Sequence, residues 1–206
     1  MAKRYEFHAD KPHSGLLDKL YITPKQRLSI LKWTLLGLVV LLLSVLQDVV
    51  LCRFRLFGAT TDLVPCAIIL ICIMEGVENG CVFAFASSLI YQFSGSAPGM
   101  YAMVFLTVVA ILAAIFRQSY LQKGFGAAFF CASAALIIYE LLIFFMGLFL
   151  DLSIPGRIIG FLITGGLSLI SIPLLYPLVM LIGAIGGSIW TELPDSALAG
   201  FCCSLL

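Results

Sequence analysis

The sequence predicts an all-α, polytopic integral membrane protein with about six transmembrane helices. Of its 206 residues, 62% are hydrophobic and only 11% are charged, and the mean hydropathy is +1.11. Soluble globular domains of this size do not have such a composition. The apolar runs are continuous rather than alternating, which indicates membrane-spanning helices rather than strands.

Six apolar stretches are candidates for crossing the bilayer, which requires about 20 apolar residues in a straight helix. The predicted spans are Ser29–Val50, Asp62–Met74, Asn79–Phe93, Met100–Phe116, Phe125–Leu150 and Ile158–Ile189. The second and third are short, so they are interpreted as tilted, partly buried helices, with a re-entrant hairpin as the main alternative. The last is long and contains Pro173 and Pro177, so we expect a kink or break near Pro173.

Basic residues set the expected orientation, because cytoplasmic segments carry an excess of Lys and Arg. Residues 1–28 form a basic N-terminal tail, residues 29–190 the transmembrane domain, and residues 191–206 a short C-terminal tail. Placing both tails in the cytoplasm puts the N-terminal cluster on the same side as Arg117 and Lys123. Three arginines then lie outside, namely Arg53, Arg55 and Arg157. We therefore expect both termini to be cytoplasmic.

Small residues recur at every fourth position after the second span, at Gly76, Gly80, Ala84 and Ser88. A four-residue step keeps to one face of a helix. Small side chains on such a face let a second backbone approach closely, which is how helices associate in a membrane. We therefore expect this stripe to lie at a helix–helix contact.

Acidic residues are the candidate polar contacts within or beside the spans. Glu140 is the only one deep inside a long apolar run, where an ionisable group usually faces the protein interior or a cavity. It is interpreted as a proton or ligand site, as a contact to a partner helix, or as a hydrogen-bonded structural residue. Asp62 is expected to cap the second span by accepting backbone N–H bonds. Glu75 and Glu78 are expected to be solvated turn residues at the cytoplasmic surface, with contact to a basic partner as the alternative.

The sequence indicates neither catalysis nor metal binding. The seven cysteines have no CxxC spacing, and most lie in or beside apolar runs, so they are interpreted as small packing residues. The histidines, His8 and His13, both lie in the N-terminal tail, and no GxSxG, HExxH or phosphate-binding motif occurs. We expect no catalytic residue, no metal and no cofactor; an intramembrane enzyme would depend on Glu140 alone.

A recognisable pattern extends from Gln47 to Gly99. It has a glutamine near the end of the first span, then Gly58 and the run Thr61, Asp62 and Leu63, then the small residues at 76, 80, 84, 88, 95 and 99. This pattern resembles the MreD family, the bacterial rod shape-determining membrane proteins. In that family a proline stands where this chain has Thr61, and an aspartate is common where this chain has Gln92.

The resemblance implies a non-enzymatic scaffold of the cell-wall elongation machinery, or elongasome, in the bacterial inner membrane. Such proteins regulate cell shape and peptidoglycan synthesis by binding MreC, and through it MreB, the RodA glycosyltransferase and a penicillin-binding transpeptidase. They are surrounded by membrane lipid and bind no nucleic acid. The candidate partner or helix-packing residues are Gln47, Asp62, Glu75, Gly76, Gly80, Ala84 and Glu140.

The expected fold is also similar to that of the substrate-binding components of energy-coupling-factor vitamin transporters. This similarity gives the alternative function, a substrate-binding membrane subunit of such a transporter. Those proteins often carry an Ala-x-x-x-Ala docking motif on the first span. Between Leu35 and Leu46 this chain has only Gly37 and Ser44 as small residues, which argues against the alternative.

Overall fold

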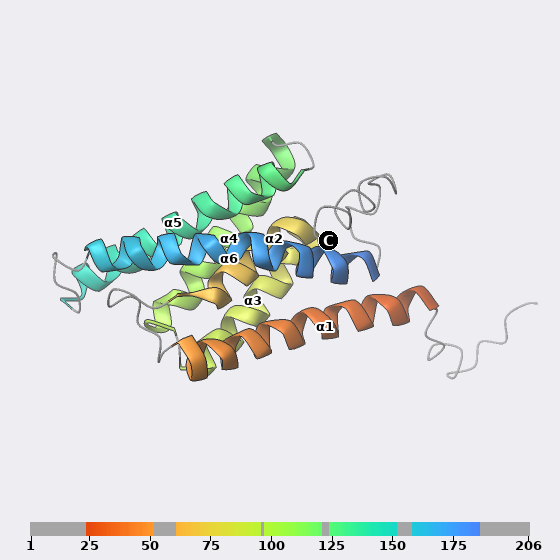
Figure 1. The fold of residues 1–206 in the computed structure, drawn as a ribbon, viewed down its shortest axis with the longest axis horizontal. Helices are drawn as coiled ribbons and strands as arrows, with labels where there is room; N and C mark the ends of the chain where they lie inside the picture. Colours follow the sequence, from red (N-terminus) through yellow and green to blue (C-terminus); the bar gives the residue numbers. More distant parts are fainter. Residues whose placement is uncertain (1–23, 52–60, 96, 121–123, 152–157, 186–206) are drawn as a thin grey trace, which may run out of the picture.

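The computed structural model describes residues 24–51, 61–95, 97–120, 124–151 and 158–185, and within these ranges all regular structure is helical (Figure 1). The elements are α1 (Pro24–Leu46), a π-helical turn η2 (Gln47–Leu51), α2 (Leu63–Glu75), α3 (Val77–Phe93), α4 (Met100–Tyr120), α5 (Phe125–Phe149) and α6 (Ile158–Ile185). The predicted all-α fold is thus confirmed. The tails and the loop arginines at 53, 55 and 157 lie outside the described residues.

Four helices are long and apolar enough to cross a membrane: Arg27–Val49, Met100–Tyr120, Phe125–Phe149 and Ile158–Ala184. The chain is therefore a multi-pass membrane protein. The helices α2 and α3 are shorter, with 13 and 17 residues. At 1.5 Å per residue α2 measures about 20 Å, which is less than the roughly 30 Å thickness of the hydrocarbon core. A total of six spans stays a prediction.

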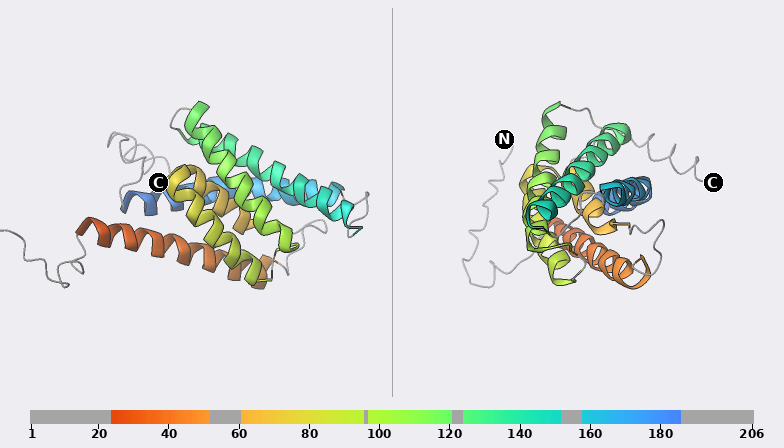
Figure 2. Two further views of the ribbon diagram at one scale, coloured as in Figure 1. Left: turned by 180° about the vertical axis from the view of Figure 1, so that it is seen from behind. Right: turned by 90° about the vertical axis from the view of Figure 1, so that its left-hand side faces the viewer.

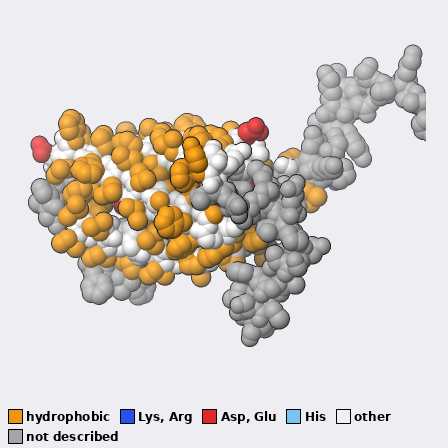
Figure 3. Space-filling model, turned by 90° about the horizontal axis from the view of Figure 1, so that it is seen from above, with side chains coloured by type: hydrophobic (Ala, Val, Ile, Leu, Met, Phe, Trp, Pro, Cys, Tyr) orange, Lys and Arg blue, Asp and Glu red, His pale blue; other side chains and the backbone are white. Residues whose placement is uncertain are grey.

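The outer surface of the bundle is apolar, as a lipid-facing surface requires. Figure 3 shows one face covered largely by hydrophobic side chains, with acidic groups near its two ends. Large apolar side chains are exposed on every long helix, for example Leu38 on α1, Leu112 on α4, Phe130 on α5 and Leu181 on α6. Contact of these side chains with lipid has no free-energy cost, whereas their exposure to water would be unfavourable.

Helix α2 is the centre of the fold. Every residue from Val64 to Glu75 is buried, and α2 contacts each of the other five α-helices. Figures 1 and 2 show the longer helices lying around it. A helix that is apolar on all sides has no face for water and belongs in such a position.

Helix α2 lies antiparallel to α1, so each end of α2 meets a different part of α1. Gln47, the first residue of the turn η2 that continues α1, contacts residues at the start of α2. Lys32, in the first half of α1, contacts Glu75, the last residue of α2. We call these the Gln47 end and the Lys32 end of the bundle. Arg117 on α4 also lies at the Lys32 end, because it bonds to Ile73.

The small-residue stripe lies at the predicted helix–helix contact. A Cβ atom at Gly80 on α3 would stand 2.9 Å from the backbone oxygen of Cys72 on α2. Ala84 and Ser88 are fully buried on the same helix, and the Ser88 hydroxyl lies 2.9 Å from that of Thr107 on α4. The contact between α2 and α3 therefore depends on the absence of a side chain at Gly80.

Gly76 has a different role from the one predicted for it. It lies between α2 and α3 rather than on the face of α3, and its φ of 84° is in the left-handed region. An L residue with a side chain adopts that conformation only with strain. Gly76 thus makes the tight turn between two antiparallel helices, and the stripe proper begins at Gly80.

Of the kink or break expected near Pro173, the break does not occur. Helix α6 continues from Ile158 to Ile185 with Pro173 and Pro177 inside it. Each proline removes one backbone N–H donor, but the remaining bonds continue on either side, as is common in membrane helices.

Three cysteines fit the packing role predicted for them. Cys66, Cys72 and Cys131 are buried and free, and the Cys131 thiol donates to the backbone oxygen of Ala113 at 3.3 Å, joining α5 to α4. Cys81 is partly exposed. The cysteines at 52, 202 and 203 lie outside the described residues.

We predict that Gly80→Ala lowers the melting temperature of the detergent-solubilised protein. The new methyl group would meet the Cys72 backbone, which cannot rotate away, and such overpacking costs about 1–3 kcal/mol. Gly126→Ala on α5 is the matched control, because no atom lies within 4 Å of that position. Equal melting temperatures for the two variants would show that α2 and α3 are not in close contact.

Candidate functional site

A cluster of polar side chains surrounds the start of α2, at the Gln47 end. The Gln47 side chain bridges α1 and α2, because its amide nitrogen donates to the Asp62 carboxylate at 3.2 Å and its amide oxygen accepts from the Val64 backbone N–H at 3.1 Å. The Ser168 hydroxyl on α6 accepts from the Asp62 backbone N–H at 2.9 Å. Two backbone donors at the start of α2 are thus satisfied by side chains from α1 and α6.

Asp62 precedes α2 as predicted, but its side chain does not cap the helix. A capping carboxylate would accept from the backbone of the first turn. Here Gln47 occupies that role at Val64, and the Asp62 carboxylate faces Gln47 instead. The sequence prediction was therefore right about the position of Asp62 and wrong about its bond.

Glu140 projects from the middle of α5 toward the same cluster and is 6% exposed. Its carboxyl group interacts with that of Asp62. The phenol groups of Tyr91 on α3 and Tyr139 on α5 interact with both carboxyl groups. The structure therefore brings three of the predicted residues together, Gln47, Asp62 and Glu140, with residues from α3 and α6 around them.

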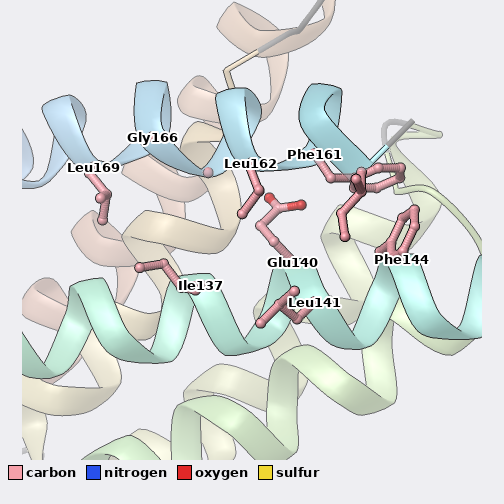
Figure 4. A pocket seen from close by; sticks show the side chains of 10 residues that line it. Ile137, Glu140, Leu141, Phe144, Phe161, Leu162, Gly166 and Leu169 are labelled. Carbon is pink, nitrogen blue, oxygen red and sulfur yellow. The ribbon is translucent and has the colours of Figure 1, made fainter. Parts of the chain in front are cut away.

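Glu140 also borders a pocket between α5 and α6, with a volume of about 220 Å³. Figure 4 shows Glu140 between the two helices, with Phe144 beside it on α5 and Phe161 and Leu162 on α6. The pocket lining is otherwise apolar or glycine. Glu140 Oε1 is buried and has no hydrogen-bond partner among the residues that the structure describes.

Charged side chains hold the other end of α2. Lys32 forms a buried ion pair with Glu75, and Arg117 donates to the backbone oxygen of Ile73 at 2.7 Å. The last carbonyl groups of a helix lack intrahelical partners and carry the negative end of its dipole. Arg117 therefore satisfies a carbonyl group at this end and matches the helix dipole, whereas Lys32 pairs with the Glu75 side chain.

The interpretation of Glu75 as a solvated turn residue was wrong. Glu75 is 4% exposed, whereas Glu78, three residues later, is exposed as predicted. Glu75 instead pairs with Lys32 of the same chain, and contact with a basic partner protein stays a prediction. Sequence reasoning did not pair Lys32 and Glu75 because they are 43 residues apart.

Sequence reasoning also missed the roles of Lys32, Arg117 and Ser168. Arg117 counted only as an orientation signal, although it is buried against α2. The available signal was position, because Lys32 and Arg117 are charged residues inside the first and fourth apolar helices. Such residues usually face the bundle interior.

The arrangement can hold helices together and can accept hydrogen bonds at Glu140. Among the described residues no group of three or more His, Cys, Asp or Glu side chains could hold a metal ion. Asp62 and Glu140 supply carboxyl oxygens to the cluster, and the Gln47 amide and the hydroxyl groups of Tyr91 and Tyr139 are the potential donors around them.

We predict that Gln47→Ala destabilises the detergent-solubilised protein by about 1–3 kcal/mol, because it leaves a buried backbone donor at Val64 unpaired. The matched control is Ser44→Ala on the same helix, since the Ser44 hydroxyl only donates to the Val40 carbonyl of its own helix. Thermal unfolding would show the difference. If both variants unfold alike, the Gln47 bridge contributes nothing to stability.

We predict that Lys32→Met is strongly destabilising, because it leaves the buried Glu75 carboxylate without its cation, a change that typically costs about 3–5 kcal/mol. The double variant Lys32→Met and Glu75→Met removes both charges and should recover most of the loss. Folded yield by size-exclusion chromatography is the measurement. A double variant as unstable as the single one would mean that the ion pair does not explain the effect.

Comparisons of this chain with protein-family models, with curated proteins and with solved structures find no match.

Proposed function

We propose that this chain is a non-enzymatic membrane scaffold of the MreD type, which regulates cell-wall elongation through binding MreC and associated peptidoglycan synthesis proteins. One observation carries the proposal: the residues behind the resemblance are the residues that assemble the bundle. Gln47 bridges α1 and α2, and Gly80 permits the α2–α3 contact. A pattern whose side chains join helices to one another favours a protein that presents a fixed surface to partners.

The proposed scaffold lies in the bacterial inner membrane with both termini in the cytoplasm. Exposed Arg27 and Glu78 lie at the Lys32 end, together with Arg117, whereas Asp48 and Asp151 lie at the opposite end. The positive-inside rule assigns the Lys32 end to the cytoplasm.

A cysteine at position 78 in a Cys-free background should resist labelling from outside intact cells, and one at position 151 should react. The reverse pattern would overturn the orientation.

Affinity purification of the full chain in a mild detergent tests the function. Recovery of MreC, with MreB, RodA or a penicillin-binding transpeptidase, would support the scaffold. Recovery of transporter ATPase subunits would support the alternative, a substrate-binding subunit of an energy-coupling-factor transporter. If neither set is recovered from membranes in which the chain is abundant and folded, both proposals fail.

We predict that Glu140→Gln is nearly silent in rod-shape complementation, whereas Glu140→Leu impairs it. Gln keeps the size of the side chain and one acceptor oxygen, whereas Leu would leave polar neighbours unpaired at a cost of roughly 1–3 kcal/mol. Both variants would be expressed in a depletion strain, with membrane abundance measured alongside. Loss of function in the Gln variant at normal abundance would favour proton exchange, and hence transport or chemistry, over a scaffold.

A further inference from the structure

The pocket between α5 and α6 contains a polar atom that none of the described residues satisfies. Glu140 is 6% exposed, and its Oε1 has no hydrogen-bond partner among the described residues. A buried acceptor without a partner is costly, more so when the group is a carboxylate. The side chain borders the pocket (Figure 4). A group placed in this pocket with a hydrogen-bond donor would remove that cost.

The size of the pocket limits what can fill it. An apolar cavity of about 150 Å³ accommodates benzene, and pockets for drug-sized ligands start near 300 Å³. The pocket here measures about 220 Å³. It therefore suits a single large side chain and is too small for a cofactor or a vitamin.

The pocket opens toward the lipid-facing side of the bundle. Leu162 on α6 is 54% exposed and Ile137 on α5 is 39% exposed, and both line the pocket. The glycine pair Gly165 and Gly166 forms part of the same wall, and Gly166 has no atom within 4 Å of its Cβ position. Exposed glycine on a membrane helix permits the backbone of another helix to approach closely.

The depth of Glu140 in the membrane decides between a lipid and a protein as the source of the donor. Glu140 stands nine residues before the end of α5 at Phe149, which is about 14 Å along the helix. Lipid headgroups lie at the membrane surface, whereas half the hydrocarbon core is about 15 Å. A headgroup would have to leave the surface to reach Glu140, whereas a side chain on a transmembrane helix is held at such a depth.

We propose that the α5–α6 pocket is the docking site for a transmembrane helix of a partner protein, which packs against Gly166 and inserts one donor-bearing side chain that bonds to Glu140. Ser, Thr, Tyr, Trp and Lys have the required chemistry. The proposal rests on the scaffold function and deepens it, because it assigns the partner to one face of the chain.

Photocrosslinking in cells that express the full chain tests the docking site. A photoreactive residue at position 162 should crosslink to a transmembrane segment of another protein, with a donor-bearing residue within one helical turn of the crosslinked position. The same residue at position 112 on the exposed face of α4 is the matched control and should not crosslink to that segment. Crosslinks at 162 to lipid only, or to a second copy of this chain only, would overturn the proposal.

Affinity purification of two glycine variants tests whether a partner helix packs at the pocket. Gly166→Leu should fill the groove and reduce the recovered partner to roughly one tenth or less, equivalent to about 1.4 kcal/mol or more. Gly126→Leu, at another exposed helical glycine with no atom within 4 Å, should leave recovery unchanged. Equal recovery with both variants would place the partner elsewhere while leaving the scaffold function intact, and absence of any partner from the unaltered chain would refute the scaffold itself.

A double-substitution cycle tests the proposed hydrogen bond between the partner's donor side chain and Glu140. Replacing the partner's donor with Leu should weaken recovery about as much as Glu140→Leu does, and combining the two should add little, because each change removes the same bond. Glu140→Gln keeps an acceptor oxygen and should retain the partner. Additive losses would show that the donor and Glu140 do not meet, which would overturn the proposed contact.

Discussion

A helix whose two ends are buried within a protein must find hydrogen-bond partners there for its terminal peptide groups, because no water is available to them. This constraint governs α2. The helix has only 13 residues and is buried along its length. At its start, Gln47 and Ser168 accept from backbone N–H groups. At its end, Arg117 donates to the Ile73 carbonyl and the Gly76 N–H donates to the Cys72 carbonyl. The surrounding helices thus do more than exclude lipid; they complete the backbone bonding of α2.

The two ends of α2 are completed by different chemistry. Neutral amide and hydroxyl groups accept from the backbone N–H groups at its start, whereas the Arg117 cation donates to a carbonyl group at its end. Charge at the second end matches the negative pole of the helix dipole. The pairing of Lys32 with Glu75 then keeps the net charge buried there low, which reduces the large cost of removing an isolated cation from water.

The sequence predicted what local patterns determine and missed what distant contacts determine. Apolar runs predicted the positions of the helices. The fourth span, for example, was predicted at Met100–Phe116, and α4 extends over Met100–Tyr120. The four-residue spacing placed Gly80 at a helix contact because helical periodicity is local. The ion pair of Lys32 and Glu75 and the cap from Gln47 join residues 43 and 17 positions apart, and no pattern within one helix indicates which residues meet.

The acceptor that Ser168 provides for Asp62 lies 106 residues further along the chain. A ribosome makes the chain from its N-terminus, so α2 is synthesised well before α6 exists. During that interval the start of α2 lacks one of its final hydrogen bonds, and its buried faces lack the helices that later cover them. The start of the central helix therefore cannot reach its final set of hydrogen bonds until α6 has been made.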